Sequence, residues 1–476
     1  MTEKSTGTAA PVDAGLRRGV MGGPELAAQA IANIAPSAVI AFTAAAIFLS
    51  AGSGTIYAFA LATIVILCVG YCVSVFARKH ASAGSLYTYV SKGLGPFGAY
   101  LAGIALLVGC WGIAAGSLGG AAFYAGEFLT LLGIPAANLV GYVLLTILLG
   151  GLATLFTIRG IRLSARVSLV LELLSVSIIL ILLVLSLAWA GPAAWDPSQF
   201  ALEGIPLQGV AAGAVLGILG FVGFSSADAL GREARNPYTA IPRAIMWSAL
   251  GVGVLYVFAA YTQVAVIEDL GASANPLVDM ATLIGMPAWF LPVLTFGVGA
   301  SFFAVVVAPL NVVGRILYVM GKEGVVLERF GRTHERFLTP HRVLLVFGPA
   351  AIVLDVIMLL FGTHPMDIVV WVDTYGTYGY MVAYALVAIA CIIYTRRAGI
   401  PNVLVWITGV IAVVAMAYVF FANVYPVPAF PFDVIPYIFL ATVLVAVGWY
   451  LYLRSARPKV IENIGNTETD VLEGVG

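Results

Sequence analysis

Long apolar segments alternate with short polar segments along most of the chain. Twelve apolar segments are about as long as the roughly 20 residues that a helix needs to cross the hydrocarbon core of a membrane. They cover residues 27–50, 56–77, 97–131, 137–157, 167–190, 208–231, 242–267, 289–320, 343–363, 367–394, 402–422 and 434–453. This pattern predicts an all-α integral membrane protein with twelve transmembrane helices.

The basic residues are distributed unevenly between the segments that connect these spans. All 23 Lys and Arg residues lie in the two tails, or in or beside the five loops that twelve spans place on the same side as the tails. Because Lys and Arg concentrate in cytoplasmic loops, both termini are predicted to be cytoplasmic. Residues 1–26 and 454–476 are polar and are predicted to be cytoplasmic tails without fixed structure.

Composition excludes several other classes of protein. With 61% hydrophobic residues, 10% charged residues and a net charge of zero, the chain offers no basic surface for a nucleic acid. The four cysteines lie inside apolar segments, where packing is their expected role, and the four histidines lie in loops or at span ends. We therefore predict no metal site, no cofactor and no enzymatic activity.

Two of the spans contain residues that interrupt helices. Span one has Pro36 near its middle, and span six has Gly220 and Gly223. Unwound backbone at membrane depth survives only where it lines a cavity or is covered by protein. Gly and Pro in membrane helices often serve only close packing, but two interruptions five spans apart are typical of transporters built from inverted repeats. The predicted substrate-binding residues at the breaks are Asn33, Ile34, Ala35, Pro36, Ser37, Phe221, Gly223, Phe224, Ser225 and Ser226.

Several motifs resemble those of the amino acid, polyamine and organocation permeases. The segment GREARNPYTAIPRAI (231–245) resembles the signature that follows span six in that superfamily. The segments ASAGSLYTYVSKGLGPFGAYLAG (81–103), RILYVMGKEG (315–324) and TPHRV (339–343) agree with it in type and order. The resemblance implies a LeuT-like fold: a 5+5 inverted repeat (27–190 and 208–394) with discontinuous spans one and six, and two additional helices (402–453).

The sequence departs from the family pattern at positions that bear on coupling. Ser225 stands where many members have an acidic residue, and Arg232 replaces the first of two glutamates, which leaves Glu233. Ser175 occupies a position on span five where some proton-coupled members have a lysine. The resemblance therefore leaves the coupling ion open between H⁺ and Na⁺.

Ionisable groups inside spans are costly and are functional candidates for that reason. Glu172 could carry a proton or act as a counter-charge, and Asp228 could face a cationic amine or pair with Arg232 four residues later. Asp355 and Asp373 are weaker candidates. The resembled fold adds Trp111 on span three and Ser301 on span eight as pocket residues, and we interpret Arg232 and Glu233 as a cytoplasmic gate.

These observations predict a secondary active transporter in a bacterial cytoplasmic membrane, with an amino acid or a related organic amine as its small-molecule partner. The substrate amine is expected at the carbonyl ends of Ile34, Ala35 and Phe221, and a carboxylate at the N–H groups near Ser37, Ser225 and Ser226. A polyamine permease, an amino acid exchanger and a membrane sensor that binds without transport remain alternatives. The sequence leaves the oligomeric state open.

Overall fold

Long helices make up nearly all of the protein, whose structure was obtained as a computed structural model. The structure describes residues 15–195, 197–200, 207–267, 270–273, 275–400, 402–467 and 469–471. Most of the N-terminal tail predicted from the sequence, residues 1–14, lies outside the described residues, as do residues 472–476 at the other end.

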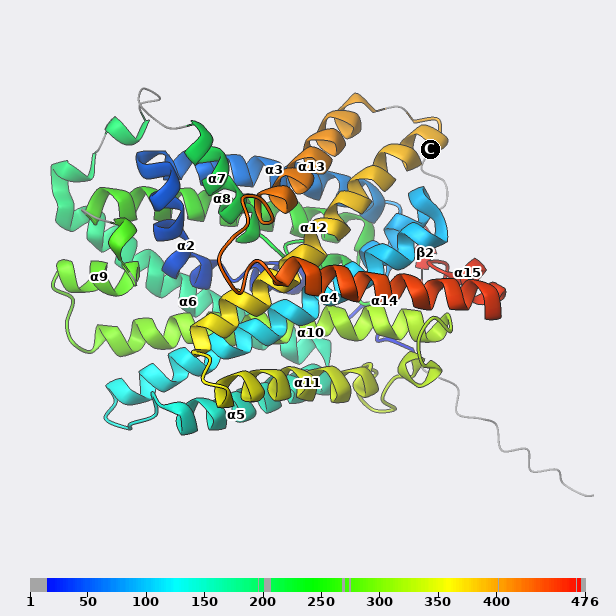
Figure 1. Ribbon diagram of the computed structural model, residues 1–476, viewed down its shortest axis with the longest axis horizontal. Coiled ribbons are helices and arrows are strands. Elements are labelled where there is room, and N and C mark those ends of the chain that lie inside the picture. The colour runs from blue at the N-terminus through cyan, green and yellow to red at the C-terminus, as the bar shows by residue number, and fades with distance from the viewer. Residues whose placement is uncertain are drawn as a thin grey trace, which may run out of the picture.

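Fifteen α-helices occur in the described part of the chain (Figure 1). They are α1 (Gly23–Ile34), α2 (Pro36–Ala51), α3 (Thr55–Ala77), α4 (Leu86–Leu131), α5 (Leu139–Arg159), α6 (Ile161–Ala190), α7 (Leu207–Leu219), α8 (Pro237–Val266), α9 (Pro276–Leu283), α10 (Phe290–Lys322), α11 (His341–Leu360), α12 (Pro365–Arg397), α13 (Val403–Ala422), α14 (Ile435–Ala456) and α15 (Pro458–Asn463). Short 3-10 turns connect several of them, including η4 (Ser226–Leu230).

The length and composition of these helices agree with a protein that crosses the membrane many times. Ten helical segments among the described residues are long and apolar enough to span a bilayer, and the shorter α7 is also apolar. Large apolar side chains such as Leu49, Val140 and Val445 are mostly exposed on the outside of the bundle, as expected for surfaces that contact lipid.

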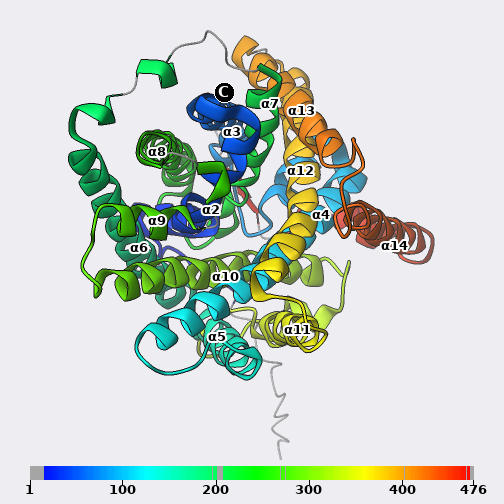
Figure 2. The ribbon, with the colours of Figure 1, turned by 60° about the vertical axis from the view of Figure 1, so that its left-hand side comes forward.

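Helices α4 and α12 cross near the middle of the bundle, while α5, α11 and α14 lie at its periphery (Figure 2). Small residues allow the two central helices to approach closely. A side chain at Gly379 of α12 would place its Cβ 2.2 Å from the carbonyl oxygen of Ala105, and one at Gly112 of α4 would meet the backbone of Gly376 at 2.7 Å. Such small-residue contacts are typical of helix pairs in membranes.

Among the described residues, two three-residue strands interrupt the otherwise helical fold. Strand β1 (His80–Ser82) pairs antiparallel with β2 (Thr469–Val471), so that His80 lies opposite Val471. Figure 1 shows β2 and α15 together at one end of the molecule, opposite to α9. The predicted tails are therefore shorter than the sequence suggested, because α1 already begins at Gly23, and α15 and β2 give the C-terminal tail defined structure.

Candidate functional site

The first break separates α1 from α2 at Ala35. This residue adopts left-handed backbone angles (φ 57°, ψ 56°), which non-glycine residues rarely do, and Pro36 then begins α2. A proline lacks the backbone N–H that a continuous helix needs, and it disfavours helical backbone at the residue before it. The predicted interruption of span one is thus present, and Pro36 explains its position.

The second break follows α7, which ends at Leu219. The chain then continues in turns through residues 220–225 before η4, and Gly223 has a positive φ of 88°. A side chain at Gly223 would place its Cβ 2.5 Å from Asn33 Nδ2, so glycine is required for the close approach as well as for the backbone angle. The side-chain amide of Asn33 donates to the carbonyl oxygen of Gly223 over 3.1 Å. The two breaks, 190 residues apart in the sequence, are therefore in direct contact.

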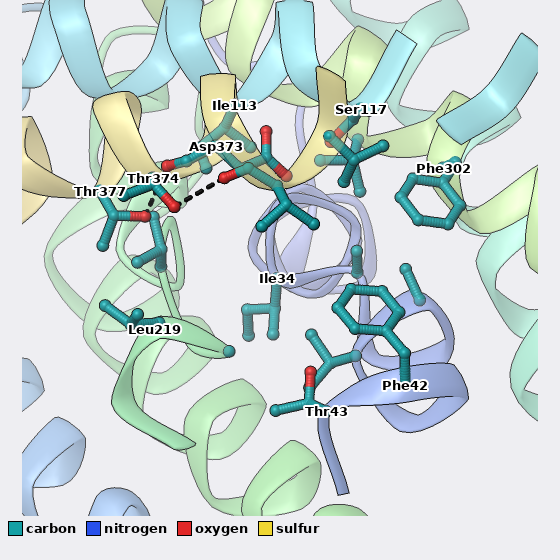
Figure 3. Close-up of a pocket in the computed structure, with 18 of the residues that line it drawn as sticks. Ile34, Phe42, Thr43, Ile113, Ser117, Leu219, Phe302, Asp373, Thr374 and Thr377 are labelled. Carbon is teal, nitrogen blue, oxygen red and sulfur yellow. Dashed lines mark hydrogen bonds between the residues drawn. The ribbon is translucent and has the colours of Figure 1, made fainter. Parts of the chain in front are cut away.

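A cavity of about 320 Å³ lies beside the two breaks (Figure 3). Residues of α1, α2, α4, α7, α10 and α12 and of the second break line it, and most of its wall is apolar, with Phe42, Ile113, Leu219 and Phe302 among the larger side chains. Its polar lining residues are Asn33, Thr43, Ser117, Asp373, Thr374 and Thr377. A concave, mostly apolar site with a few convergent polar groups is the usual form of a small-molecule site.

The predicted substrate-binding residues fall into two groups in the structure. Asn33, Ile34 and Ala35 line the cavity, and Gly223 contacts Asn33. The other predicted residues, which do not line it, are Pro36, Ser37, Trp111, Phe221, Phe224, Ser225, Ser226 and Ser301.

Hydrogen bonds explain several of the placements outside the cavity. The Ser226 hydroxyl donates to the carbonyl oxygen of Gln29 (2.9 Å), and the Trp111 indole donates to the carbonyl oxygen of Phe347 on α11 (3.0 Å). The carbonyl of Phe221, which was expected to meet the substrate amine, accepts the N–H of Phe224 at 3.2 Å. The backbone and side chains of the span-six break are thus largely occupied by contacts within the protein.

Glu172 of α6 brings together residues of three predicted spans. Its Oε1 accepts hydrogen bonds from the hydroxyls of Ser301 (3.1 Å) and Ser37 (3.4 Å), and the side chain is 2% exposed. Its other oxygen has no hydrogen-bond partner among the described residues. Pro36 and Glu172 line a second, smaller cavity, of about 190 Å³. Ser175, one turn further along α6, is buried.

The expected pairing of Asp228 with Arg232 is corrected by the structure. Asp228 accepts a short hydrogen bond of 2.5 Å from the hydroxyl of Ser85, at the start of α4. Arg232 forms an ion pair with Asp470 of β2. The two residues were four apart in a predicted helix, but this segment is a 3-10 turn followed by non-helical turns, so the helical spacing does not apply.

Glu233, the second predicted gate residue, forms a fully buried ion pair. Both of its oxygens accept from the guanidinium of Arg315, over 2.6 and 2.9 Å, and Arg315 Nη1 donates to the carbonyl oxygen of Asn311. The carbonyl of Glu233 accepts the N–H groups of Val20 and Met21, which precede α1. Arg315 counts among the basic residues in or beside a loop in the charge pattern; it lies near the end of α10 and is 1% exposed.

The structure also brings residues to the cavity that sequence reasoning passed over or ranked low. Asp373, Thr374 and Thr377 come from the polar run WVDTYGTYGY of α12, and this run was the available signal. Thr43 and Ser117 had no such signal, because single hydroxyl residues are common in membrane helices. Their position became evident only from the packing of α2 and α4 around the breaks.

Together, the helical bundle and the cavity at two contacting helix breaks define a multi-pass membrane protein with a cavity inside the bundle. The profile of the family described as amino acid permease matches residues 26–449, and the chain belongs to this family.

Curated relatives agree with this assignment. An uncharacterized transporter of Mycobacterium tuberculosis is 26% identical over 376 residues, which are 78% of this chain and 79% of the relative. The branched-chain amino acid permease BcaP of Bacillus subtilis is 23% identical over 73% of this chain and 75% of its own length. The low-affinity putrescine importer PlaP of Escherichia coli is 25% identical over 63% and 66%.

A solved structure shows that the fold also occurs in another transporter. The substrate-bound, outward-open structure of a Na⁺-coupled sialic acid symporter superposes on 85% of this chain and 90% of its own, with a TM-score of 0.54. Because the two sequences are only 13% identical, the likeness concerns the fold alone.

Proposed function

We propose that the protein is a secondary active transporter that moves an amino acid or a related organic amine by alternating access. The observation that carries this proposal is the cavity at the point where the two broken helices meet. In transporters with inverted repeats, substrates bind near the membrane midplane between two such half-helices. Membership of the amino acid permease family and the transporter relatives support the same function.

The proposed transport core consists of ten spans in residues 27–394, arranged as a 5+5 inverted repeat of residues 27–190 and 208–394. Helices α1 and α2 form the first span, and α7 with the following break forms the sixth. In this proposal α13 and α14 are two additional spans, within residues 402–453. Twelve crossings place residues 1–26 and 454–476 on one side, and the clustering of all basic residues assigns that side to the cytoplasm of a bacterial cell.

The proposed orientation also indicates in which half of the protein, outer or cytoplasmic, the cavity lies. The cavity is lined by α2 and α7, the half-helices on the side of the breaks that is away from the basic loops. In the proposed orientation, the cavity therefore belongs to the outer half of the protein. On the opposite side, the Glu233–Arg315 and Arg232–Asp470 ion pairs join the loop after η4 to α10 and β2. The conformation is therefore proposed to be closed toward the cytoplasm.

The half-helix ends beside the cavity suit a small charged substrate. The carbonyl groups at the end of α1 carry partial negative charge and favour an ammonium group, while the first N–H groups of α2 favour a carboxylate. Ile34 and Ala35 line the cavity at this point. The substrate is proposed to lie across the break, with its amine toward Ile34 and Ala35.

For the coupling ion we propose H⁺, bound at Glu172. The carboxyl group joins α6 to α2 and α10 through Ser37 and Ser301, and it has an oxygen without a protein partner among the described residues. Loss or gain of a proton there would change contacts between helices that must move during alternating access. Glu172→Gln should therefore abolish uptake driven by a pH gradient but retain substrate exchange; a Na⁺-driven uptake that survives this change would contradict H⁺ coupling.

Flux measurements in proteoliposomes test the proposed function. Thr43 lines the cavity from α2, whereas Leu49 on the same helix is 74% exposed. Thr43→Trp should fill part of the cavity and abolish uptake of amino acids and amines, while Leu49→Trp should leave it unchanged. Binding of these compounds without uptake or exchange in the wild-type protein would favour the alternative function of a membrane sensor.

A further inference from the structure

Two aspartates that are not among the predicted substrate-binding residues lie on the consecutive helices α11 and α12, one fully buried and one half-buried. Asp373 of α12 lines the cavity, and Figure 3 shows it among the side chains drawn around the space. Asp355 of α11 is 0% exposed.

Neither carboxyl group is satisfied by the protein. Both oxygens of Asp355 and Oδ1 of Asp373 lack hydrogen-bond partners among the described residues. A carboxylate that serves only the fold is normally paired or hydrogen-bonded when it is buried, because desolvation of an unpaired charge is costly. Of the two, Asp373 lines the cavity, so its carboxyl group is the one that a ligand in the cavity can reach.

The groups around Asp373 offer hydrogen-bond acceptors and few hydrogen-bond donors. Among the described residues that line the cavity, Asp373 is the only one with a charged side chain. The hydroxyl of Thr377 donates to the carbonyl oxygen of Asp373 (2.7 Å) and that of Thr374 to Val370 (2.6 Å), so toward the cavity these oxygens act as acceptors. Asn33 uses its amide N–H₂ on Gly223 and Tyr380, and its Oδ1 has no partner among the described residues.

We propose that Asp373 is the specificity-determining residue of the substrate site and binds the ammonium group of an organic amine of net positive charge. An ammonium supplies three donors and a positive charge, which match one carboxylate and the hydroxyl oxygens of Thr374 and Thr377. The apolar wall formed by residues such as Phe42 and Phe302 receives the rest of the molecule. The N–H groups at the start of α2 favour the carboxylate of a zwitterion, but this carboxylate would meet the negative charge of Asp373 in the same cavity, so cationic amines are preferred.

This inference rests on the proposed function, since it takes the cavity to be the substrate site. It also assigns to Asp373 the role that sequence reasoning gave to Asp228 or Glu172 for a substrate without a carboxylate. Asp228 is bonded to Ser85 and Glu172 to Ser37 and Ser301, and neither lines this cavity.

A matched pair of ligands tests the preference. Valine and isobutylamine differ only by the carboxyl group, and 1,4-diaminobutane adds a second ammonium. The affinity of purified wild-type protein for each is measured by thermal shift and by competition with transported substrate. We expect isobutylamine and 1,4-diaminobutane to bind at least ~tenfold more tightly than valine. Tighter binding of valine, or binding of none of the three, would overturn the assignment of the substrate class.

Substitutions in α12 test the proposed role of Asp373. Asp373→Asn should weaken amine binding by at least ~tenfold, Asp373→Glu should restore part of it, and Asp367→Asn, an exposed aspartate on the same helix, should have no effect. Unchanged amine binding by Asp373→Asn would contradict the proposal even if the protein transports amines. If Asp373→Asn does not fold, the comparison of valine with its amine in the wild type still decides the proposed preference. Absence of flux for every amine and amino acid would instead contradict the proposed transport function.

Discussion

At the scale of single residues, the buried ion pair of Glu233 and Arg315 shows how one contact can hold together the side of the protein that is proposed to face the cytoplasm. Its two side chains are 1% and 2% exposed, and the guanidinium binds the carboxylate through two nitrogens. A buried pair of this kind offsets a large desolvation cost, and removal of one partner leaves the other charge uncompensated. The pair thus ties the loop after η4 to α10.

Glu233→Gln is expected to destabilise the protein by roughly 3–5 kcal/mol, because Arg315 would keep its charge in an apolar environment. The melting temperature in detergent measures the effect. Glu335→Gln, at an exposed position, is the control and should be neutral. The double variant Glu233→Gln/Arg315→Met should recover part of the loss; equal stability of Glu233→Gln and the wild type would contradict this interpretation.

The buried carboxyl group of Glu323, just after the end of α10, should make the stability of the protein depend on pH. Burial raises the pKa of its carboxyl from 4.5 to about 7, against the hydrogen bonds from Tyr87, Thr467 and Gly465, which lower it. The fold therefore favours the neutral carboxyl. The stabilisation that the protein gains from the neutral carboxyl is fully present below pH 4.5 and is lost as the pH rises through about 7.

Glu323→Gln mimics the neutral carboxyl at every pH. Relative to the wild type, its melting temperature should therefore rise between pH 5.5 and pH 8, by the equivalent of up to about 2 kcal/mol. Thermal unfolding of both proteins across this range provides the measurement, with the exposed Glu328→Gln as a control. A difference between Glu323→Gln and wild type that does not change with pH would rule out ionisation of Glu323 as the cause.

At the scale of elements, the arrangement of the cavity depends on the close packing of α4 and α12. Asp373 itself lies against this interface, since a Cβ at Gly116 of α4 would come within 2.2 Å of its Oδ1. The position of the proposed ammonium-binding group is therefore set by glycines on a different helix. Larger residues at these positions would separate the helices and widen the cavity.

Gly379→Ala should destabilise the protein by roughly 1–3 kcal/mol, because the added methyl group would meet the carbonyl oxygen of Ala105 at 2.2 Å. Gly151→Ala on α5 is the matched control: no atom lies within 4 Å of a Cβ there, and alanine favours the helix. The melting temperature should fall for the first variant and stay unchanged or rise for the second. An equal change in melting temperature for Gly379→Ala and Gly151→Ala would mean that α4 and α12 do not pack this tightly.

At the scale of the whole molecule, the proposed twelve crossings would place both termini on one side of the membrane. A reporter active only in the cytoplasm should therefore be active when fused at either terminus and inactive when inserted in the loop between α4 and α5, at residues 133–138. Activity at only one terminus would indicate an odd number of crossings. Activity at the loop alone would invert the proposed orientation.

The C-terminal segment connects distant parts of the molecule in a way that the sequence did not indicate. Strand β2 pairs with β1, Asp470 binds Arg232, and the N–H groups of Gly465 and Thr467 donate to Glu323. The polar composition of residues 454–476 indicated only a tail, because strand pairing and ion pairs with loops far away in the sequence leave no periodic pattern. This segment lies at the end of the molecule that carries the basic loops.

Much of the architecture could be predicted from the sequence because the membrane imposes a simple rule. A segment that crosses the bilayer must be long, apolar and internally hydrogen-bonded, so hydropathy alone predicts many membrane-spanning helices. The break at Pro36 was predictable for a similar reason, since proline removes a backbone donor wherever it occurs. Residues Asn33, Ile34 and Ala35 reached the cavity as expected because they adjoin this break.

Only the tertiary structure decided which polar side chains face the cavity. Ser225 and Ser226 follow the second break in the sequence, yet neither lines the cavity, whereas Asp373 comes from a helix about 150 residues later and does. The direction of a side chain depends on how its helix is rotated and packed against its neighbours, and here the contacts of Gly116 and Gly379 set this for α12. Local sequence determines where helices form and break; contacts between distant helices determine which groups face the cavity.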